Sequence, residues 1–252
     1  MIFPEQERER IEIEFWRTSE HQSPGATSLD AIINKVKDAE VFLDLLGRYR
    51  NYFPKNGRIL ELGAGHGWAS CLVKRNFPNS HVIATDISQY ALESVHRWQP
   101  IFGASPDEVY ACNSYATREP DHSIDMAFCF ASAHHFSNQQ RTLIELARIL
   151  KSEGVCIYFY EPTCERWLYP IALKRVNAKR PHVPEDLLVP SRLRQQARTA
   201  QLAVRVDYDP SIIRRSFAAG AYYRVLRKAR VLQHVLPCCA NIVISNKDSA
   251  GD

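Results

Sequence analysis

Hydrophobic and polar positions change their spacing along the chain near residue 55. Before it, residues 29–50 place apolar side chains at the spacing of an amphipathic helix. After it, short runs rich in Val, Ile and Phe alternate with amphipathic stretches. That alternation is typical of βαβ units and predicts an α/β fold: a Rossmann-like, mostly parallel sheet of seven strands with helices on both faces.

The pattern locates each element. Strands are predicted at residues 58–63, 81–86, 107–112, 124–131, 154–161, 203–208 and 240–245. Helices are predicted at residues 67–76, 88–98, 138–151, 190–202 and 211–230. A Ser137-x-x-Gln140 capping box opens the third of these helices. Residues 14–28 are polar and turn-rich, and they predict an irregular segment or a short helix.

Four regions follow from this division. They are an N-terminal helical cap (1–50), a Rossmann-like core (51–165), a basic substrate-side insertion that includes the sixth strand (166–230), and a final strand with its tail (231–252). The loops that follow the strands are the candidate binding regions, because ligands of parallel sheets bind at the carboxyl ends of the strands.

Composition places the chain among ordinary globular proteins. It is 45% hydrophobic and 24% charged, and no apolar run approaches the roughly 20 residues of a membrane-spanning helix. The acidic N-terminus has no secretory-signal pattern, so a cytoplasmic location is expected. Seven cysteines without a paired CxxC pattern predict reduced, mostly buried thiols and no metal site. The sequence makes no prediction about oligomeric state.

Charge is unevenly distributed along the chain. Residues 166–230 hold 15 Lys/Arg against 4 Asp/Glu, a balance of +11, so the remainder carries −7 of the net +4. Such a segment can attract an anionic substrate, a membrane surface or nucleic acid, or it can be a set of solvated helix faces. Within it, Trp167, Leu168, Tyr169, Ile171 and Leu173 are candidates to line an apolar pocket, with Lys174, Arg175, Lys179 and Arg180 around it.

The stretch "ELGAGHG", residues 61–67, carries the main chemical signal. Glycines follow the first predicted strand with the spacing G-x-G-x-G, where a dinucleotide-binding loop would read G-x-G-x-x-G. Glu61 stands inside the strand end, a poor neighbour for a pyrophosphate and a good one for a cationic group. Asp86 ends the second strand, where a carboxylate can accept hydrogen bonds from ribose hydroxyls. A nucleoside with a positive group, S-adenosylmethionine, satisfies all three features, and a dehydrogenase-type dinucleotide is the alternative.

Residues 58–161 resemble the class I S-adenosylmethionine-dependent methyltransferases, of the broad group that includes ubiquinone and menaquinone biosynthesis enzymes. "ELGAGHG" matches the first motif of that group, "ATDIS" its ribose-acid motif, and "LARILKSEGVCIYFYEP" its helix and fifth strand. The resemblance implies an enzyme that transfers a methyl group from S-adenosylmethionine and releases S-adenosylhomocysteine.

The resemblance also implies roles for individual residues. The cofactor-binding set it implies is Glu61, Gly63, Ala64, Gly65, Gly67, Asp86, Ile87, Asn113, Ser114 and Ala131. Glu61 would lie near the amino group, Asp86 on the ribose hydroxyls and Ile87 on the adenine, while Ala131 and Ser132 would border the sulfonium. Asn113 stands where the group often has an Asp, and its carbonyl can accept the same hydrogen bond.

Methyl transfer to oxygen or carbon usually needs a proton removed as well as an aligned acceptor. His134, His135 and Glu161, which follow the fourth strand and end the fifth, are the candidate catalytic residues. His21, His182, Tyr160 and Tyr169 are weaker candidates, and His66 is assigned no role because its side chain is expected to point away.

A small-molecule acceptor, anionic or lipidic, methylated at oxygen is the preferred interpretation. The chain has "ASAHHF" after the fourth strand, where methyltransferases of planar nitrogens carry a [DNS]-P-P-[YFW] element. No appended RNA-binding module is recognisable. A nucleic-acid methyltransferase that uses the basic segment, or a non-catalytic cofactor-binding subunit, are the alternatives.

Overall fold

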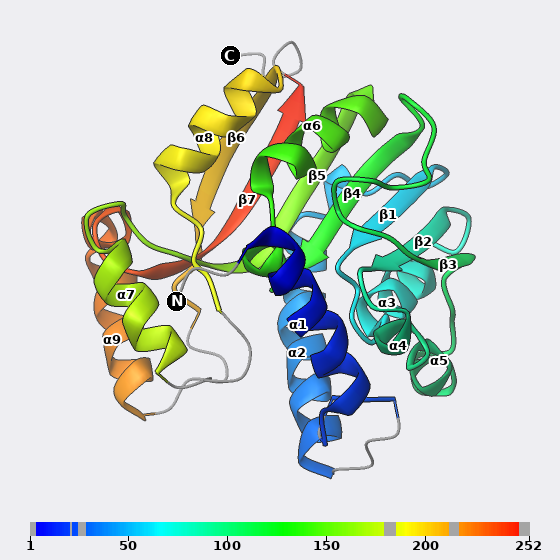
Figure 1. The fold of residues 1–252 in the computed structure, drawn as a ribbon, viewed down its shortest axis with the longest axis horizontal. Helices are drawn as coiled ribbons and strands as arrows, with labels where there is room; N and C mark the ends of the chain where they lie inside the picture. The colour runs from blue at the N-terminus through cyan, green and yellow to red at the C-terminus, as the bar shows by residue number, and fades with distance from the viewer. Residues whose placement is uncertain (1–3, 21, 25–28, 179–184, 212–216, 247–252) are drawn as a thin grey trace.

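Seven strands form one mixed sheet in the computed structural model, which describes residues 4–20, 22–24, 29–178, 185–211 and 217–246. The strand order is β3-β2-β1-β4-β5-β7-β6, and β7 runs antiparallel to both of its neighbours (Figure 1). The remaining neighbours pair in parallel, as crossover connections through helices require. The predicted seven-stranded, mostly parallel Rossmann-like fold is confirmed.

The strands keep close to the predicted positions. They are β1 (Arg58–Leu62), β2 (His81–Asp86), β3 (Glu108–Ala111), β4 (Ile124–Phe130), β5 (Leu150–Thr163), β6 (Leu202–Tyr208) and β7 (Cys238–Asn246). The longer helices are α1 (Glu5–Thr18), α2 (Leu29–Arg48), α3 (Trp68–Asn76), α5 (Val95–Phe102), α6 (Gln139–Ile149), α7 (Tyr169–Asn177), α8 (Pro190–Thr199) and α9 (Phe217–Lys228). Short helices are α4 (Gln89–Leu92) and the 3-10 turns η1 (Arg50–Tyr52), η2 (Ala133–His135) and η3 (Arg230–His234).

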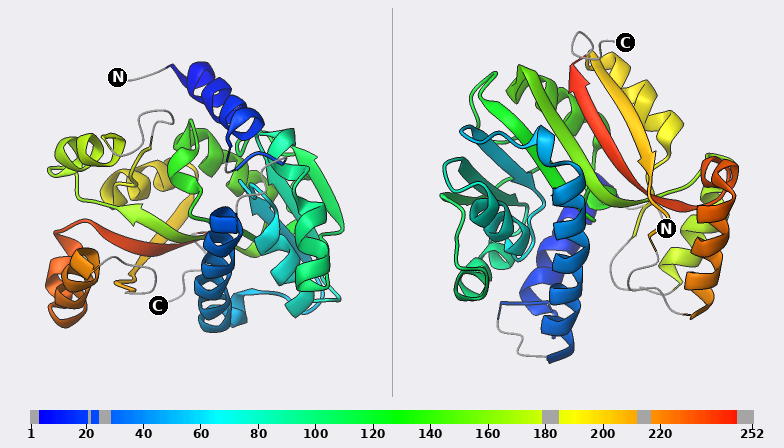
Figure 2. Two further views of the ribbon diagram at one scale, coloured as in Figure 1. Left: turned by 90° about the horizontal axis from the view of Figure 1, so that it is seen from below. Right: turned by 180° about the vertical axis from the view of Figure 1, so that it is seen from behind.

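Alternate residues of the central strands enter two separate cores, one on each face of the sheet. On one face, Phe42 of α2 stacks on Phe128 of β4 and meets Phe159 of β5 edge to face, and α3 and α5 complete the layer. On the other face, α6 and α8 pack on the sheet through side chains such as Leu146 and Leu193. The two layers lie on opposite sides of the sheet (Figure 2). Burial on both faces explains why the strands read as nearly continuous apolar runs.

Several boundaries differ from the prediction. Residues 88–98 form two helices, because α4 ends at Leu92 and α5 starts after Ser94 and continues past Pro100 to Gly103, which has φ 70°. The N-cap of α6 is Asn138, whose side chain accepts from Arg141 N at 3.1 Å, so the predicted Ser137 capping box is wrong. β5 begins at Leu150, four residues before the predicted start, and pairs there with Ile124.

The N-terminal region contributes two helices with different surroundings. α2 belongs to the sheet-covering layer, whereas α1 crosses the carboxyl ends of the parallel strands and buries none of its residues (Figure 1). α1 ends at Thr18, so the start of the stretch predicted as an irregular segment or a short helix is helical. Across the described ranges, none of the helices combines the length and the apolarity needed to cross a membrane.

Candidate functional site

The loop between β1 and α3 is shaped by three glycines with positive φ, namely Gly63 (65°), Gly65 (52°) and Gly67 (70°). L-residues rarely adopt this conformation. A Cβ at Gly63 would overlap Ser132 Oγ, which lies on the loop after β4. The glycines therefore let the loops after β1 and β4 approach each other at the switch point of the strand order.

Two buried carboxylates stand behind this loop. Asp86 accepts from Gly65 N and Ser88 N, each at 2.8 Å, and burial nevertheless raises its pKa to about 7. Glu61 accepts a hydrogen bond from Ser70 Oγ, and burial raises its pKa to about 8. Neither carboxylate has a cationic side chain bonded to it in the described part of the chain. A bound cation or hydroxyl donors would stabilise both carboxylates in their ionised form.

A cavity of about 60 Å³ lies at the carboxyl ends of β1 to β4. Its lining combines residues of the strand loops with residues of α1. The loops contribute Gly63, Thr85, Asp86, Ile87, Cys112, Asn113, Ser114, Tyr115, Ser132, His135, Phe136 and Ser137, and α1 contributes Arg8, Glu9 and Glu12. Of the predicted cofactor residues, Gly63, Asp86, Ile87, Asn113 and Ser114 line it, whereas Glu61, Ala64, Gly65, Gly67 and Ala131 are not part of its lining.

α1 is held on this cavity by acidic side chains on one face. Glu9 accepts from Tyr115 OH at 2.6 Å and from Ser137 Oγ at 2.7 Å. Glu5 accepts from Asn138 and Arg141 of the α6 start. Ligand pockets usually measure about 300–1,000 Å³, so the cavity of about 60 Å³ beneath α1 is small for a ligand of nucleoside size.

The far end of α1 packs on the glycine loop. Trp16 meets the His66 ring edge to face at 5.0 Å, and a Cβ at Gly65 would lie 3.1 Å from the Trp16 ring. The other side of the imidazole contacts Gln22, through Nε2 and the backbone oxygen at 2.7 Å, and burial lowers the pKa of His66 to about 4. His66 is absent from the cavity lining, and its ring contacts the segment that closes over the loop.

Three predicted catalytic residues meet at the turn after β4. Glu161 is fully buried and accepts from Ser132 N and Ala133 N, each at 2.8 Å, and from His134 Nδ1 at 2.8 Å. Burial opposes its ionisation, but His134 and these donors outweigh burial and keep the pKa of Glu161 below its usual value. Glu161 thus fixes the turn and lines neither of the two cavities described here.

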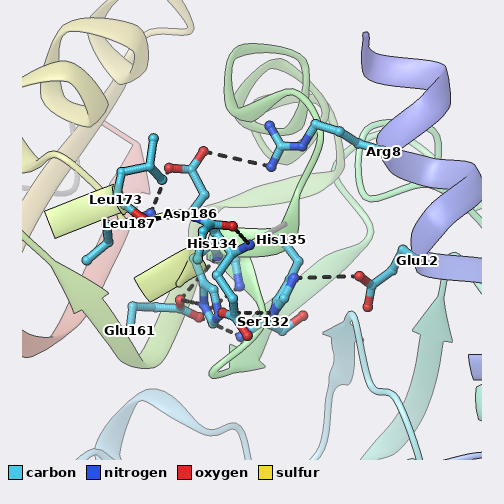
Figure 3. A network of polar contacts seen from close by, with 12 residues as sticks. Arg8, Glu12, Ser132, His134, His135, Glu161, Leu173, Asp186 and Leu187 are labelled. Atoms are coloured by element: carbon cyan, nitrogen blue, oxygen red, sulfur yellow. Dashed lines mark hydrogen bonds and ion pairs between the residues drawn. The ribbon is translucent and has the colours of Figure 1, made fainter. Parts of the chain in front are cut away.

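The pKa values of the two histidines of this turn are shifted in opposite directions. Burial would lower the pKa of His134, but the charges of Glu161 and Glu185 raise it to about 9. Burial and the neighbouring His134 charge lower the pKa of His135, which remains neutral. Glu12 of α1 approaches His135 Nδ1 at 3.6 Å, and Arg8 approaches Asp186 at 3.8 Å (Figure 3).

A second cavity of about 310 Å³ lies on the other side of this turn. α1, the start of α6, α7 and α8 enclose it together with residues 186–189. The polar residues of its lining are Arg8, His134, Ser137, Asn138, Gln139, Tyr169, Asp186, Arg192 and Gln196. Arg8, Phe136 and Ser137 line both cavities, so the two are adjacent.

The remaining predicted residues are distributed as follows. Tyr169 lines the second cavity and donates to Asp186 at 2.7 Å, whereas Trp167 and Ile171 are 64% and 69% exposed and line neither cavity. Tyr160 stacks on Phe130. Lys179, Arg180, His21 and His182 lie outside the described residues.

The sequence predicted an N-terminal cap and a substrate-side insertion, but it did not identify which of their residues reach the site, namely Arg8, Glu9 and Glu12 of α1 and residues within 185–193. The spacing of Glu5, Glu9 and Glu12 places three acids on one helix face, and this signal could have identified α1 as a site element. No comparable signal marks Glu185, which reaches His134 through the fold.

Comparison with known proteins finds similar sequences for the central part of the chain. Residues 60–158 match a family model described as "Methyltransferase domain". A malonyl-acyl-carrier-protein O-methyltransferase of Gallionella capsiferriformans (strain ES-2) is 26% identical over 140 residues, 54% of this chain and 48% of that protein. The enzyme of the same name from Methylococcus capsulatus is 30% identical over 115 residues, 46% of this chain and 41% of that protein. The aligned part of the chain thus spans about half the length of these relatives, or less.

Solved structures share the fold. A geranyl diphosphate C-methyltransferase from Streptomyces coelicolor A3(2) superposes with a TM-score of 0.69 at 12% identity, covering 97% of this chain and 100% of that one. A putative sarcosine dimethylglycine methyltransferase from Galdieria sulphuraria gives 0.62 at 16% identity, covering 96% and 99%.

Proposed function

We propose that the chain, whose residues 60–158 match the methyltransferase-domain model, is an S-adenosylmethionine-dependent methyltransferase acting on an oxygen of a small-molecule acceptor. The observation that carries the proposal is the pair of buried carboxylates, Glu61 and Asp86, behind a glycine loop at the switch point of the sheet. The two curated relatives are named as O-methyltransferases, which supports oxygen as the methylated atom.

The cofactor side of the site follows from the donors and acceptors present. Asp86 would accept hydrogen bonds from the ribose hydroxyls of the cofactor, and Glu61 would lie near the cofactor's amino group. Asn113, whose amide donates to Tyr115 OH at 2.8 Å, retains a carbonyl oxygen for the adenine amino group. Ser132 lines the same cavity as His135. The acidic character of these walls suits a cationic nucleoside better than a pyrophosphate.

S-adenosylmethionine, when bound, supplies a methyl group activated by a positively charged sulfur. The protein contributes alignment of the acceptor with that methyl group and removal of water, which together account for much of the acceleration in such displacements. α1 excludes water, since Glu9 and Glu12 cover the cavity from the solvent side.

We assign the second cavity to the acceptor and infer that the acceptor carries a carboxylate. Arg192 and Arg8 line this cavity, and a carboxylate pairs with guanidinium groups in bidentate geometry. A carboxylate oxygen is ionised at neutral pH and needs no base before it attacks. The name of the curated relatives, malonyl-acyl-carrier-protein O-methyltransferase, supports an acyl conjugate as one form of this acceptor.

The histidine turn would then hold the acceptor rather than deprotonate it. His134 and His135 line the second and the first cavity respectively, so the turn separates the two. We propose that both histidines bind the acceptor oxygen and that Glu161 is a positioning residue.

The cysteines are free throughout the described part of the chain, which supports the proposed cytoplasmic location.

Calorimetric titration with S-adenosylmethionine tests the cofactor assignment. We expect Asp86→Asn to weaken binding by about 10-fold or more, since an ionised acceptor is lost. Asp121→Asn is the matched control, because Asp121 is exposed and pairs with Arg148. Binding of NAD in place of S-adenosylmethionine would overturn the proposal in favour of a dehydrogenase.

Radiolabelled methyl transfer to malonyl conjugates and to short dicarboxylates tests the acceptor. Carboxyl methyl esters release methanol in alkali, whereas methylated nitrogen and carbon do not. Alkali-stable label would contradict carboxyl methylation. Cofactor binding without turnover of any carboxylate would point to the non-catalytic alternative.

A further inference from the structure

Three side chains converge where the two cavities meet. His134 Nε2 lies 3.2 Å from Glu185 Oε2, and His135 Nε2 lies 3.7 Å from the same oxygen. All three ligand atoms lie within 4.8 Å of one another. His134 and Glu185 are buried, and His135 is partly buried.

These separations suit a shared metal ion. Imidazole nitrogens and carboxylate oxygens bind Zn²⁺ at about 2.0–2.2 Å in tetrahedral geometry. Two such ligands are then about 3.4 Å apart. The distances of 3.2 and 3.7 Å bracket that value, so small side-chain rotations would place an ion between the three atoms.

A carboxylate also lies near the Nδ1 atom of each imidazole. His134 Nδ1 donates to Glu161 at 2.8 Å, and His135 Nδ1 faces Glu12 of α1 at 3.6 Å, from opposite sides of the pair (Figure 3). Ligating histidines typically give their second nitrogen to a carboxylate, which fixes the ring and raises its basicity. Both histidines therefore direct Nε2 toward the same point.

The carboxylate partner is fixed independently of the histidines. The side-chain amide of Asn177 accepts from Glu185 N at 3.0 Å and donates to Glu185 O at 2.8 Å. The histidine turn is fixed by Glu161 through the backbone amides of Ser132 and Ala133. The ligands come from two separately stabilised segments, as a preorganised site requires.

We propose that His134, His135 and Glu185 bind one divalent transition-metal ion of the Zn²⁺ class. Two imidazoles and one carboxylate are a donor set that such ions favour, and three protein ligands leave a coordination position open. His135 lines the first cavity and His134 the second. If the proposed function holds, the open coordination position would anchor the acceptor carboxylate; the metal site itself does not depend on that function.

Metal analysis of untagged protein tests the site. The protein is stripped with chelator, loaded with Zn²⁺ or Co²⁺, passed over a desalting column, and assayed for bound metal and for the visible absorption of Co²⁺. We expect one ion per chain. Glu185→Gln and His135→Gln should each weaken Zn²⁺ binding at least 10-fold in chelator competition. His96→Ala is the control, since His96 is an exposed histidine outside the cluster.

Two results would overturn the proposal. One is wild-type protein that retains no more Zn²⁺ than Glu185→Gln, which would mean that a doubly protonated His134 donates to Glu161 from Nδ1 and to Glu185 from Nε2 instead of binding metal. The other is an equal loss in His96→Ala, which would indicate surface binding. Titration of the metal-free protein with S-adenosylhomocysteine is run in parallel, so that failure of the cofactor assignment and failure of the metal site are scored separately.

Discussion

At the scale of single residues, Gly63 makes the sharpest demand on side-chain size. Its φ of 65° is unfavourable for any other residue, and a Cβ there would meet both Ser132 and Phe136. We expect Gly63→Ala to destabilise the protein by about 1–3 kcal/mol. It should also abolish cofactor binding, because the loop after β4 is displaced. Denaturant unfolding and calorimetry measure the two effects.

Gly47 provides the matched control for this substitution. It lies in the last turns of α2, and nothing occupies the space within 4 Å of a Cβ there. Gly47→Ala should leave binding unchanged and raise stability by up to about 1 kcal/mol, the usual gain for a helical position. Equal destabilisation at both positions would contradict the contact argument.

Glu61 should make stability depend on pH. Burial raises its pKa from 4.5 to about 8, so between these values the folded protein holds a proton that the unfolded chain has released. This contribution to stability is complete below about pH 4 and is lost as the pH rises through 8, with a slope of up to about 1.4 kcal/mol per pH unit. Calorimetric melting of ligand-free wild type and Glu61→Gln from pH 5 to 9 should show wild type losing stability relative to the variant. Parallel curves would show that Glu61 does not titrate in this window.

At the scale of elements, α1 should control how fast the cofactor enters. Glu9 ties the helix to Tyr115 and Ser137, and each of these bonds must break when the helix shifts. We expect Glu9→Gln to speed S-adenosylhomocysteine association by roughly 10-fold, the kinetic equivalent of about 1.4 kcal/mol. Stopped-flow tryptophan fluorescence can follow this through Trp16.

Glu7→Gln is the control for the helix, since Glu7 pairs with Arg10 on the same helix and lines neither cavity described here. Unchanged association in both variants would mean that the helix does not limit entry.

Elements with strong local patterns were predictable from sequence, and elements set by long-range contacts were not. The strands are apolar because helices bury both faces of the sheet, and that pattern survives in the sequence. The helix at residues 88–98 was predicted to end before Pro100, yet α5 continues past it to Gly103. α1 buries no residue, so it lacks the apolar stripe by which a helix is recognised, and polar contacts hold it in place.

The candidate site likewise has residues that a local sequence pattern identified and residues whose roles depend on long-range contacts. Glu61, the glycines and Asp86 are local to two strand ends, and their spacing alone suggested a nucleoside site. His134 and His135 were found as a pair, but the raised pKa of His134 depends on Glu161 and on Glu185, which is 51 residues later in the chain. The role of Glu161 in fixing the turn required the backbone geometry of residues 132–134.

At the scale of the whole molecule, the sheet keeps a cofactor cavity with acidic walls apart from a second cavity that includes basic residues. The segment with a balance of +11 contributes Arg192 to the second cavity, while Asp86, Glu9 and Glu12 line the first. Arg8 lines both cavities and Asp186 lines the second, so acidic side chains outnumber basic ones in the first cavity and basic ones outnumber acidic ones in the second. This difference in balance favours a cationic cofactor on one side and an anionic acceptor on the other. The basic segment thus gains a role that needs no nucleic acid.

Arg192 and Arg194 allow this charge arrangement to be tested. Both are exposed on α8, but only Arg192 lines the second cavity. With a carboxylate acceptor, Arg192→Gln should raise KM about 10-fold and leave kcat nearly unchanged, because a guanidinium that binds ground state and transition state alike affects KM alone. Arg194→Gln should alter neither. Raising salt from 50 to 500 mM should raise the wild-type KM and reduce the difference between wild type and Arg192→Gln, since screening weakens an exposed charge. An Arg194→Gln effect as large as that of Arg192→Gln would mean that the basic segment attracts the acceptor through its overall charge and not through the second cavity.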